Sequence, residues 1–265
     1  MGSVAAGVDI GSTTAKCALI VDGAVLFGPI LPTGAKPTKA GEQALQQALL
    51  KLNSSVDKKY VVATGYGRVT APFANETVTE ISCHGRGAHY LEPSTRTVID
   101  IGGQDSKAIA LSDNGRVADF VLNDKCAAGT GRFLEFASRL VLEVQLEDLG
   151  ALSTKATMPA KISSTCTVFA LTEIVSLLAE GNSKENIVAG LHSAISQRVA
   201  AMVRKVGVRP TVMLTGGVAK NVGLRATLAK ELGVGVNPPS KADPQLVGAL
   251  GAAIVARERL EKQTS

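Results

Sequence analysis

Val4-Ala5-Ala6-Gly7-Val8-Asp9-Ile10-Gly11 has the pattern of a buried strand that ends in a glycine turn, and Thr97-Val98-Ile99-Asp100-Ile101-Gly102 repeats it. Five identities keep one spacing: Asp9, Ile10, Gly11, Lys16 and Asp22 recur 91 positions later as Asp100, Ile101, Gly102, Lys107 and Asp113. Both copies continue into a second strand, a hairpin turn rich in Asp and Gly, and a third strand. The repeat predicts a duplicated α/β unit, with chance among common residues as the alternative.

The remaining pattern divides the chain into a strand-rich half and a helix-rich half. Strands are predicted at 4–10, 15–21, 24–31, 60–64, 97–102, 108–111, 117–122 and 211–214. Helices are predicted at 38–52, from 133, at 168–179, around 187–203, from 219 and around 246–254, and a loop at 65–68. We therefore expect one domain at 1–95, completed by a C-terminal helix at 244–262, and a second domain at 96–243.

Composition limits the classes of function. A hydrophobic fraction of 45% in 265 residues supports a large core. Aromatic residues make up 3% with no Trp, and the Lys and Arg behind the net charge of +5 are scattered. We therefore expect no nucleic-acid partner, whereas an acidic protein or an anionic small substrate fits the charge. A leader pattern and an apolar run of membrane length are both absent, which predicts a cytoplasmic protein without a membrane partner.

The two Asp-Ile-Gly turns are suited to phosphate binding. Glycine lets backbone N–H groups approach phosphate oxygens, and nearby hydroxyls and lysines add donors and positive charge. The candidate phosphate residues are Gly11, Ser12, Thr13, Thr14, Ala15, Lys16, Gly102, Gly103 and Gln104, with Lys107 as further positive charge. Asp9 and Asp100 end their strands, where carboxylates can hold Mg²⁺ through its waters. A third turn, Gly216-Gly217-Val218, follows a predicted strand and is expected beside the nucleoside.

These three turns resemble the two phosphate motifs and the adenosine motif of the acetate kinase, sugar kinase, Hsp70 and actin superfamily. Within it, the stretches 63–68, 79–85, 99–105, 123–133, 163–169 and 214–218 resemble one branch. That branch contains the ATP-dependent activators of 2-hydroxyacyl-CoA dehydratases, in the BadF/BadG/BcrA/BcrD-type ATPase family. The resemblance covers nearly the whole chain. It implies a duplicated actin-like (ribonuclease H-like) ATPase fold, with the nucleotide in the cleft between two domains.

Four cysteines without a Cys-x-x-Cys pair do not match the common zinc and thioredoxin spacings. Cys126 and Cys166 each precede a predicted helix start, where the helix dipole favours a thiolate. The resemblance implies that they hold one [4Fe-4S] cluster that bridges a homodimer, with two thiolates from each chain. The alternative is a cluster held by all four cysteines of one chain. Packing is expected for Cys17, and the role of Cys83 stays open. The three histidines, His84, His89 and His192, form no metal pattern, and His192 is expected to pack.

The resemblance also implies an activity. ATP hydrolysis would drive one low-potential electron to an iron-sulfur dehydratase, with ferredoxin or flavodoxin as the electron donor, and would change the angle between the cluster helices. Asp105 is the candidate for orienting or deprotonating the attacking water, and turn capping is an equally good interpretation. Gln245 is expected to border the base. Arg132 and Lys125 are the first candidates for contact with the electron acceptor.

Three other functions stay open at this point. An ATPase subunit of a benzoyl-CoA reductase-type or other double-cluster reductase would share these motifs. A small-molecule kinase of the same superfamily would share the phosphate turns but would not need two cysteines at helix starts. A sensor or scaffold would bind ATP and a cluster without driving electron transfer.

Overall fold

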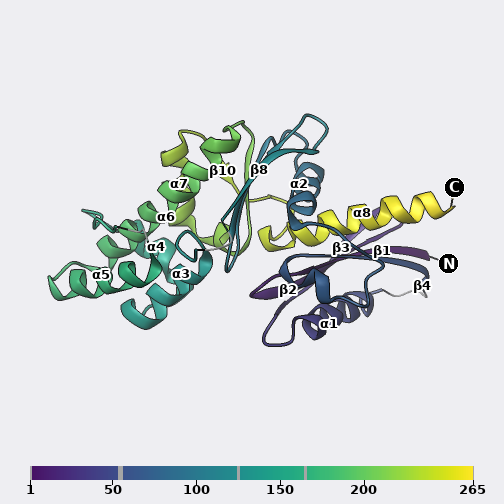
Figure 1. Ribbon diagram of the computed structural model, residues 1–265, viewed down its shortest axis with the longest axis horizontal. Coiled ribbons are helices and arrows are strands. Elements are labelled where there is room, and N and C mark those ends of the chain that lie inside the picture. Colours follow the sequence, from purple (N-terminus) through teal and green to yellow (C-terminus); the bar gives the residue numbers. More distant parts are fainter. Residues whose placement is uncertain (1, 53–55, 124–125, 164–165, 265) are drawn as a thin grey trace. The chain divides into compact units, whose positions relative to one another are not determined.

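The structure is a computed structural model that describes residues 2–52, 56–123, 126–163 and 166–264. The chain forms two compact units, and its strands form two five-stranded sheets (Figure 1). Unit 1 comprises Met1–Thr95, Leu111–Ala118 and Pro239–Ser265, and unit 2 comprises Arg96–Ala110 and Asp119–Pro238. Within the described ranges, none of the helices combines the length and apolar character that crossing a bilayer requires.

The first sheet has the strand order β3-β2-β1-β4-β5. Its strands are β1 (Gly2–Ile10), β2 (Thr14–Val21), β3 (Ala24–Pro32), β4 (Val56–Thr64) and β5 (Glu76–Thr77). The first three strands are antiparallel neighbours, and β4 and β5 join in parallel. Between β2 and β3, Asp22 and Gly23 have φ values of 48° and 83°, the left-handed pair that a two-residue hairpin turn requires.

Helices cover both faces of this sheet. Side chains alternate along β1, so Val8 packs with α1 (Pro37–Leu49) and Ala5 packs with α8 (Val247–Thr264). A third helix, α2 (Glu80–Leu91), packs against α8 (Figure 1). A Cβ at Gly7 would collide with the carbonyl oxygen of Ala249, so glycine at this position lets α8 approach the strand.

The second sheet has the order β10-β9-β6-β7-β8. Its strands are β6 (Thr97–Ile101), β7 (Ser106–Leu111), β8 (Val117–Asn123), β9 (Val212–Thr215) and β10 (Val236–Asn237). The helical elements of unit 2 are α3 (Gly131–Phe136), the π turn η2 (Ala137–Leu142), η3 (Leu146–Asp148), α4 (Leu149–Ser153), α5 (Thr167–Ala179), α6 (Lys184–Val206), η4 (Gly217–Lys220) and α7 (Val222–Leu232). Its largest core side chain is Phe133, which is fully buried.

The strand register confirms the repeat. Asp9 pairs with Lys16 across β1 and β2, and Asp100 pairs with Lys107 across β6 and β7. All the paired positions of β6 and β7 keep the spacing of 91 from their counterparts in β1 and β2. The strand orders correspond as well, with β6 in the central place that β1 has in the first sheet. The predicted duplicated α/β fold is therefore correct.

The repeat also includes two glycines, Gly65 and Gly216, that do not keep the spacing of 91 residues. Thr64 ends β4 and Thr215 ends β9, each opposite the aspartate of the central strand. Gly65 and Gly216 follow, each with φ of 84°, a value that favours glycine. They open two 3₁₀ turns, η1 (Tyr66–Thr70) and η4. The loop predicted at 65–68 is therefore a short helical turn.

Most predicted elements are present, and the differences concern their ends, the shortest segments and the 12-residue helix α2, which is not among the predicted helices. The strand expected from residue 60 begins at Val56, and α1 ends at Leu49 instead of continuing to 52, with the Leu50 side chain 82% exposed. The helix expected from 133 begins at Gly131 and continues into the π turn. The sequence did not predict α4, β5 or β10, because two to five residues are too few to show a period.

Candidate functional site

The first glycine turn joins β1 to β2 in unit 1. Gly11 N donates to the carbonyl oxygen of Thr14 at 3.0 Å, which closes the turn. The Lys16 ammonium lies 2.9 Å from Asp9 Oδ2, and both side chains are buried. The hydroxyl of Thr33, just after β3, donates to the carbonyl oxygen of Gly11 at 2.8 Å. The turn therefore has a buried ion pair beneath it and a fixed backbone path.

The second glycine turn joins β6 to β7 in unit 2 and closes in the same way, since Gly102 N donates to the carbonyl oxygen of Asp105 at 3.0 Å. Lys107 Nζ lies 3.1 Å from Asp100 Oδ2 and 2.9 Å from Asp105 Oδ2. The Thr215 hydroxyl donates to Asp100 Oδ1 at 2.9 Å. The Asp105 side chain is 24% exposed and that of Asp100 is 5% exposed, so Asp105 is the more accessible of the two carboxylates.

Thr215 was not among the predicted site residues. The available signal was the Thr-Gly pair at 64–65, which recurs at 215–216 after the matching strands.

The other predicted phosphate residues differ in accessibility. Thr13 and Gln104 are exposed, and Ser12 is half-buried. Ala15 is fully buried within β2, where it pairs with Ile10 of β1 and Leu31 of β3.

The predicted nucleoside residues lie in both units. Gly217 is exposed at the start of η4, whereas the Val218 side chain is buried. A Cβ at Gly216 would collide with the carbonyl oxygen of Ile101, at the end of the strand that carries Asp100. Gln245 belongs to unit 1, in η5 (Pro244–Leu246), where its N–H donates to a capping aspartate.

Direct hydrogen bonds join the second glycine turn to the segment that follows Cys126. Gly131 N donates to the carbonyl oxygen of Gly102 at 2.8 Å, and Arg132 N donates to that of Gly103 at 2.9 Å. The Ser106 hydroxyl also donates to the carbonyl oxygen of Gly129. These bonds link the first turn of α3 and the segment before it to the second glycine turn.

Cys126 lies four residues before Thr130, the N-cap residue of α3. The Asn123 amide donates to the carbonyl oxygens of Cys126 at 3.1 Å and Ala128 at 3.3 Å, which fixes this loop. Arg132 is ion-paired with Glu135 at 2.8 Å. Lys125 lies outside the described residues, as do the neighbouring 124 and the pair 164–165.

Cys166 is the N-cap residue of α5, and Ala170 N donates to its carbonyl oxygen at 3.0 Å. Both Cys126 and Cys166 are half-exposed free cysteines next to helix starts. The described part of the chain contains no group of three or more His, Cys, Asp or Glu side chains that could hold a metal ion.

The other two cysteines belong to unit 1 and are fully buried. Burial raises the pKa of Cys17 to about 12 and that of Cys83 to about 12. Both groups are therefore neutral thiols near neutral pH.

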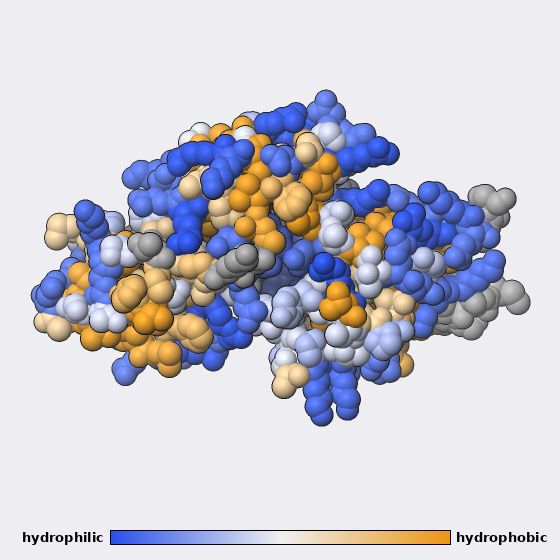
Figure 2. Space-filling model, in the orientation of Figure 1, coloured by the Kyte–Doolittle hydropathy of each residue, from blue (hydrophilic) through white to orange (hydrophobic). Residues whose placement is uncertain are grey.

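The face of unit 2 near Cys166 is unusually apolar. In α5 only Ala170 and Ile174 are buried, and Val168 and Phe169 are 67% and 72% exposed. Leu140, in the π turn that packs against α5, is 71% exposed. Figure 2 shows the orange, hydrophobic surface that results on this part of unit 2. Exposed apolar surface of this kind commonly marks an interaction site.

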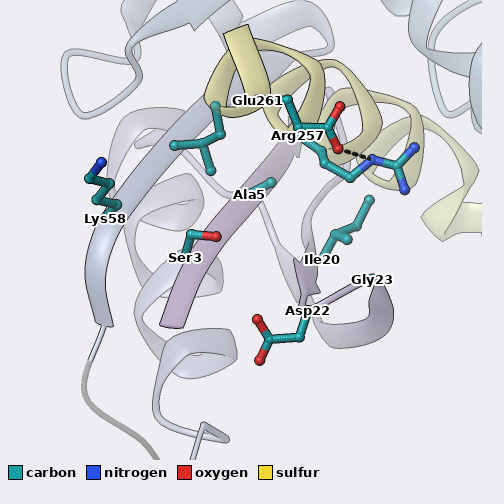
Figure 3. A pocket seen from close by; sticks show the side chains of 9 residues that line it. Ser3, Ala5, Ile20, Asp22, Gly23, Lys58, Arg257 and Glu261 are labelled. Atoms are coloured by element: carbon teal, nitrogen blue, oxygen red, sulfur yellow. Dashed lines mark ion pairs between the residues drawn. The ribbon is translucent and has the colours of Figure 1, made fainter. Parts of the chain in front are cut away.

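A separate pocket of about 240 Å³ lies in unit 1 (Figure 3). Ser3 and Ala5 at the start of β1 line it, together with Arg257 and Glu261 of α8, whose Nε and Oε1 atoms are 3.6 Å apart. Ser3 is roughly 20 Å along the strand from Asp9, at the usual rise per residue. The pocket contains no residue of the predicted nucleotide site.

Comparison with known proteins identifies the family of this site. The chain matches the BadF/BadG/BcrA/BcrD ATPase family over residues 6–256. It is 43% identical to the activator of lactoyl-CoA dehydratase of Anaerotignum propionicum, over 97% of this chain and 98% of that protein.

Two solved structures are similar over almost their full length. One is the activator of the 2-hydroxyisocaproyl-CoA dehydratase from Clostridium difficile with bound ADPNP (TM-score 0.87, 40% identity, 100% of this chain and 97% of that chain). The other is component A of the (R)-2-hydroxyglutaryl-CoA dehydratase of Acidaminococcus fermentans (TM-score 0.88, 40% identity, 98% and 99%). With a duplicated actin-like fold, two matching glycine turns and this similarity, the chain belongs to the BadF/BadG/BcrA/BcrD ATPase family.

Proposed function

We propose that the chain is an ATP-driven electron donor to a 2-hydroxyacyl-CoA dehydratase. Units 1 and 2 would correspond to the ATPase domains expected at 1–95 (with helix 244–262) and 96–243. The two glycine turns would bind phosphate oxygens, and the Gly216–Val218 turn would lie by the nucleoside. The repeated Asp-Lys pair beneath each turn supports this assignment, because it places the same buried carboxylate and ammonium beside both turns.

Asp105 is our assignment for orienting the attacking water. Its carboxylate is the more accessible one at the second turn, and Lys107 holds it beside Gly102. Asp9 and Asp100 are buried and already paired with lysines, so they fit Mg²⁺ held through its waters better than direct ligation. Bound Mg²⁺ would neutralise phosphate charge during hydrolysis.

Cys126 and Cys166 fit half of a [4Fe-4S] site. They are the two half-exposed cysteines of the chain; Cys166 is the N-cap at the positive end of α5, and Cys126 lies four residues before the N-cap of α3. Four thiolates then require a second copy of the chain, which leads us to propose a homodimer. The exposed apolar side chains of α5, next to Cys166, are suited to that contact. When bound, the cluster would supply one low-potential electron.

The observation that carries the proposal is the pair of hydrogen bonds from Gly131 and Arg132 to the phosphate turn at Gly102 and Gly103. Rearrangement of this turn on ATP binding or hydrolysis would move the first turn of α3 and the loop that holds Cys126. A nucleotide-dependent change at Cys126 therefore needs no further connecting element within unit 2.

The acceptor follows from the relatives, which are named as activators of lactoyl-CoA, 2-hydroxyisocaproyl-CoA and (R)-2-hydroxyglutaryl-CoA dehydratases. We propose an iron-sulfur dehydratase of this class as the partner and ferredoxin or flavodoxin as the electron donor. Of the two residues first considered for acceptor contact, Arg132 stays a candidate although it is paired with Glu135.

Anaerobic purification tests the proposal through three measurements: iron per chain, native mass and ATP-dependent reduction of the dehydratase recovered by pull-down from the host. We expect a brown dimer with four irons per two chains and electron transfer that requires ATP. A colourless protein that phosphorylates a small molecule would show a kinase instead. A brown dimer whose ATPase rate does not depend on the redox state of the cluster would indicate a sensor.

A further inference from the structure

A buried histidine and a half-buried asparagine form a pair next to the Gly216–Val218 turn. His192 of α6 is fully buried, and its Nε2 lies 3.0 Å from Asn221 Nδ2. Asn221 stands at the junction of η4 and α7. Its N–H donates to the carbonyl oxygen of Val218 at 2.9 Å, and its Oδ1 accepts a hydrogen bond from Leu224 N at 2.9 Å. One asparagine therefore joins the end of the turn, the start of α7 and the imidazole ring.

This network fixes the state of the ring. Because Asn221 Oδ1 already caps α7, its amide nitrogen faces His192, and an amide nitrogen can only donate. The assignment from this network is that Nε2 accepts and that Nδ1 carries the hydrogen of a neutral ring. Burial lowers the pKa of His192 to about 4, which keeps the ring neutral near pH 7.

Two glycines let neighbouring helices close around the pair. A Cβ at Gly150 of α4 would lie 3.1 Å from Asn221 Oδ1. A Cβ at Gly223 of α7 would lie 3.1 Å from His192 Nδ1 and would collide with Ser153 Oγ. The tight packing leaves little freedom for either member of the pair.

The imidazole ring of His192 lowers the stability of the folded chain, so stability alone does not explain a histidine at this position. His192 Nδ1 has no hydrogen-bond partner among the described residues, and neither does Ser196 Oγ one helical turn later. A buried donor without a partner costs about 1–3 kcal/mol. An apolar side chain of similar size would avoid that cost.

We propose that His192 is a positioning residue which, through Asn221, holds the Gly216–Val218 turn in the form that receives the nucleoside. The inference rests on the proposed nucleotide role of that turn. His192 itself would not contact the nucleotide, because its side chain is fully buried.

Calorimetric titration of the purified protein with ADP and with a non-hydrolysable ATP analogue tests this role. His192→Leu removes the acceptor and also the unpaired Nδ1. We expect Kd to rise on the order of fivefold for both nucleotides, equivalent to one lost hydrogen bond. The melting temperature should stay at or above that of the wild type. His192→Gln, whose amide oxygen can accept from Asn221, should restore binding to within about twofold of the wild type.

Two further variants separate positioning from packing. Ser196→Ala removes the other unpartnered group of this helix face and should leave Kd unchanged. Asn221→Ser keeps a helix-capping oxygen but loses the amide donor, so its Kd should rise like that of His192→Leu. The double variant should show no further rise, because both changes remove one contact.

Unchanged Kd in His192→Leu would overturn the inference, whether or not the melting temperature falls. In that case the wild type would still bind nucleotide, and the proposed function would stand. A wild-type protein that binds neither nucleotide would overturn the proposed function and this inference with it.

Discussion

The two glycine turns share their backbone but differ in what surrounds them. Both close with a hydrogen bond from Gly11 or Gly102 to the residue three positions later, and both cover a buried Asp-Lys pair. In unit 1 that later residue is Thr14, and Thr33 holds the turn. In unit 2 it is Asp105, and backbone groups near Cys126 hold the turn. The two turns therefore share their backbone closure and their buried ion pair, whereas the second alone has a carboxylate at the closing position and hydrogen bonds to the segment that follows Cys126.

The strongest test of this difference concerns the cysteines themselves. Cys126→Ala and Cys166→Ala should each abolish iron binding while nucleotide binding persists, because both thiolates are proposed ligands in unit 2. Cys17→Ala, in β2 of unit 1, is the control. This variant should keep its iron, since the Cys17 thiol is fully buried and neutral. Iron analysis and calorimetric titration measure both effects. A full complement of iron in Cys166→Ala would show that the ligand assignment is wrong.

The second test compares the residues that close the turns. Asp105→Ala should lower the ATPase kcat by about 10²–10⁴, the usual contribution of a positioned acid or base, with the cluster intact. Thr14→Ala, at the corresponding position of unit 1, should change kcat far less because it removes no carboxylate. Steady-state phosphate release measures both. Similar losses in the two variants would indicate that Asp105 serves only to cap its turn.

A third test uses the 3₁₀ turns that follow the strand-end threonines. In unit 1, Arg68 Nη1 donates to the carbonyl oxygen of Gly65 at 2.9 Å, whereas in unit 2 the turn is bonded to Asn221 N, and the Asn221 side chain contacts the buried His192. The pKa of His192 is lowered from 6.5 to about 4, so between these values the unfolded chain takes up a proton that the folded chain does not. Folding stability should therefore fall as the pH decreases through this range, by up to about 3 kcal/mol.

Urea unfolding at pH 7 and pH 5 measures this loss, and most of the effect of the histidine should be visible by pH 5. His192→Gln should be less sensitive to the change, because it cannot titrate. An equal loss of stability in both proteins would show that other groups cause the pH dependence.

The smallest expected effect concerns one hydrogen bond between the second glycine turn and the segment that follows Cys126. Ser106, whose hydroxyl donates to the carbonyl oxygen of Gly129, occupies the place that Ala15 has in unit 1. Ser106→Ala therefore gives the second turn the side chain of the first and removes one hydrogen bond, worth about 1 kcal/mol. ATP hydrolysis should change little, whereas the number of electrons delivered per ATP should fall. Unchanged coupling, measured as dehydratase reduction per phosphate released, would show that this bond does not transmit the nucleotide state.

Local patterns explain what the sequence could predict. Asp22-Gly23 identified the first hairpin because two positive φ values strongly favour such residues. The spacing from Asp9 to Asp100 predicted the repeat, and the register of both strand pairs confirms it. Cys166 directly before an apolar run predicted the start of α5.

Contacts between distant segments explain what the sequence could not predict. The helices inserted between β8 and β9 change the spacing of the repeat, so Gly65 and Gly216 did not align. The hydrogen bond from Thr215 to Asp100 joins strands far apart in the chain. His192 was expected only to pack, because its partner Asn221 lies on another helix and leaves no periodic signal.

Hydrogen exchange at individual amides tests most directly whether the nucleotide state reaches the cysteine loop. The amides of Gly131 and Arg132 donate to the second turn, and the amide of Thr33 donates to the carbonyl oxygen of Thr13 in the first turn. On addition of a non-hydrolysable ATP analogue, we predict a change in exchange at Gly131 and Arg132 that extends to Cys126. Saturating nucleotide that changes exchange at Thr33 but leaves 126–132 unaffected would contradict the account.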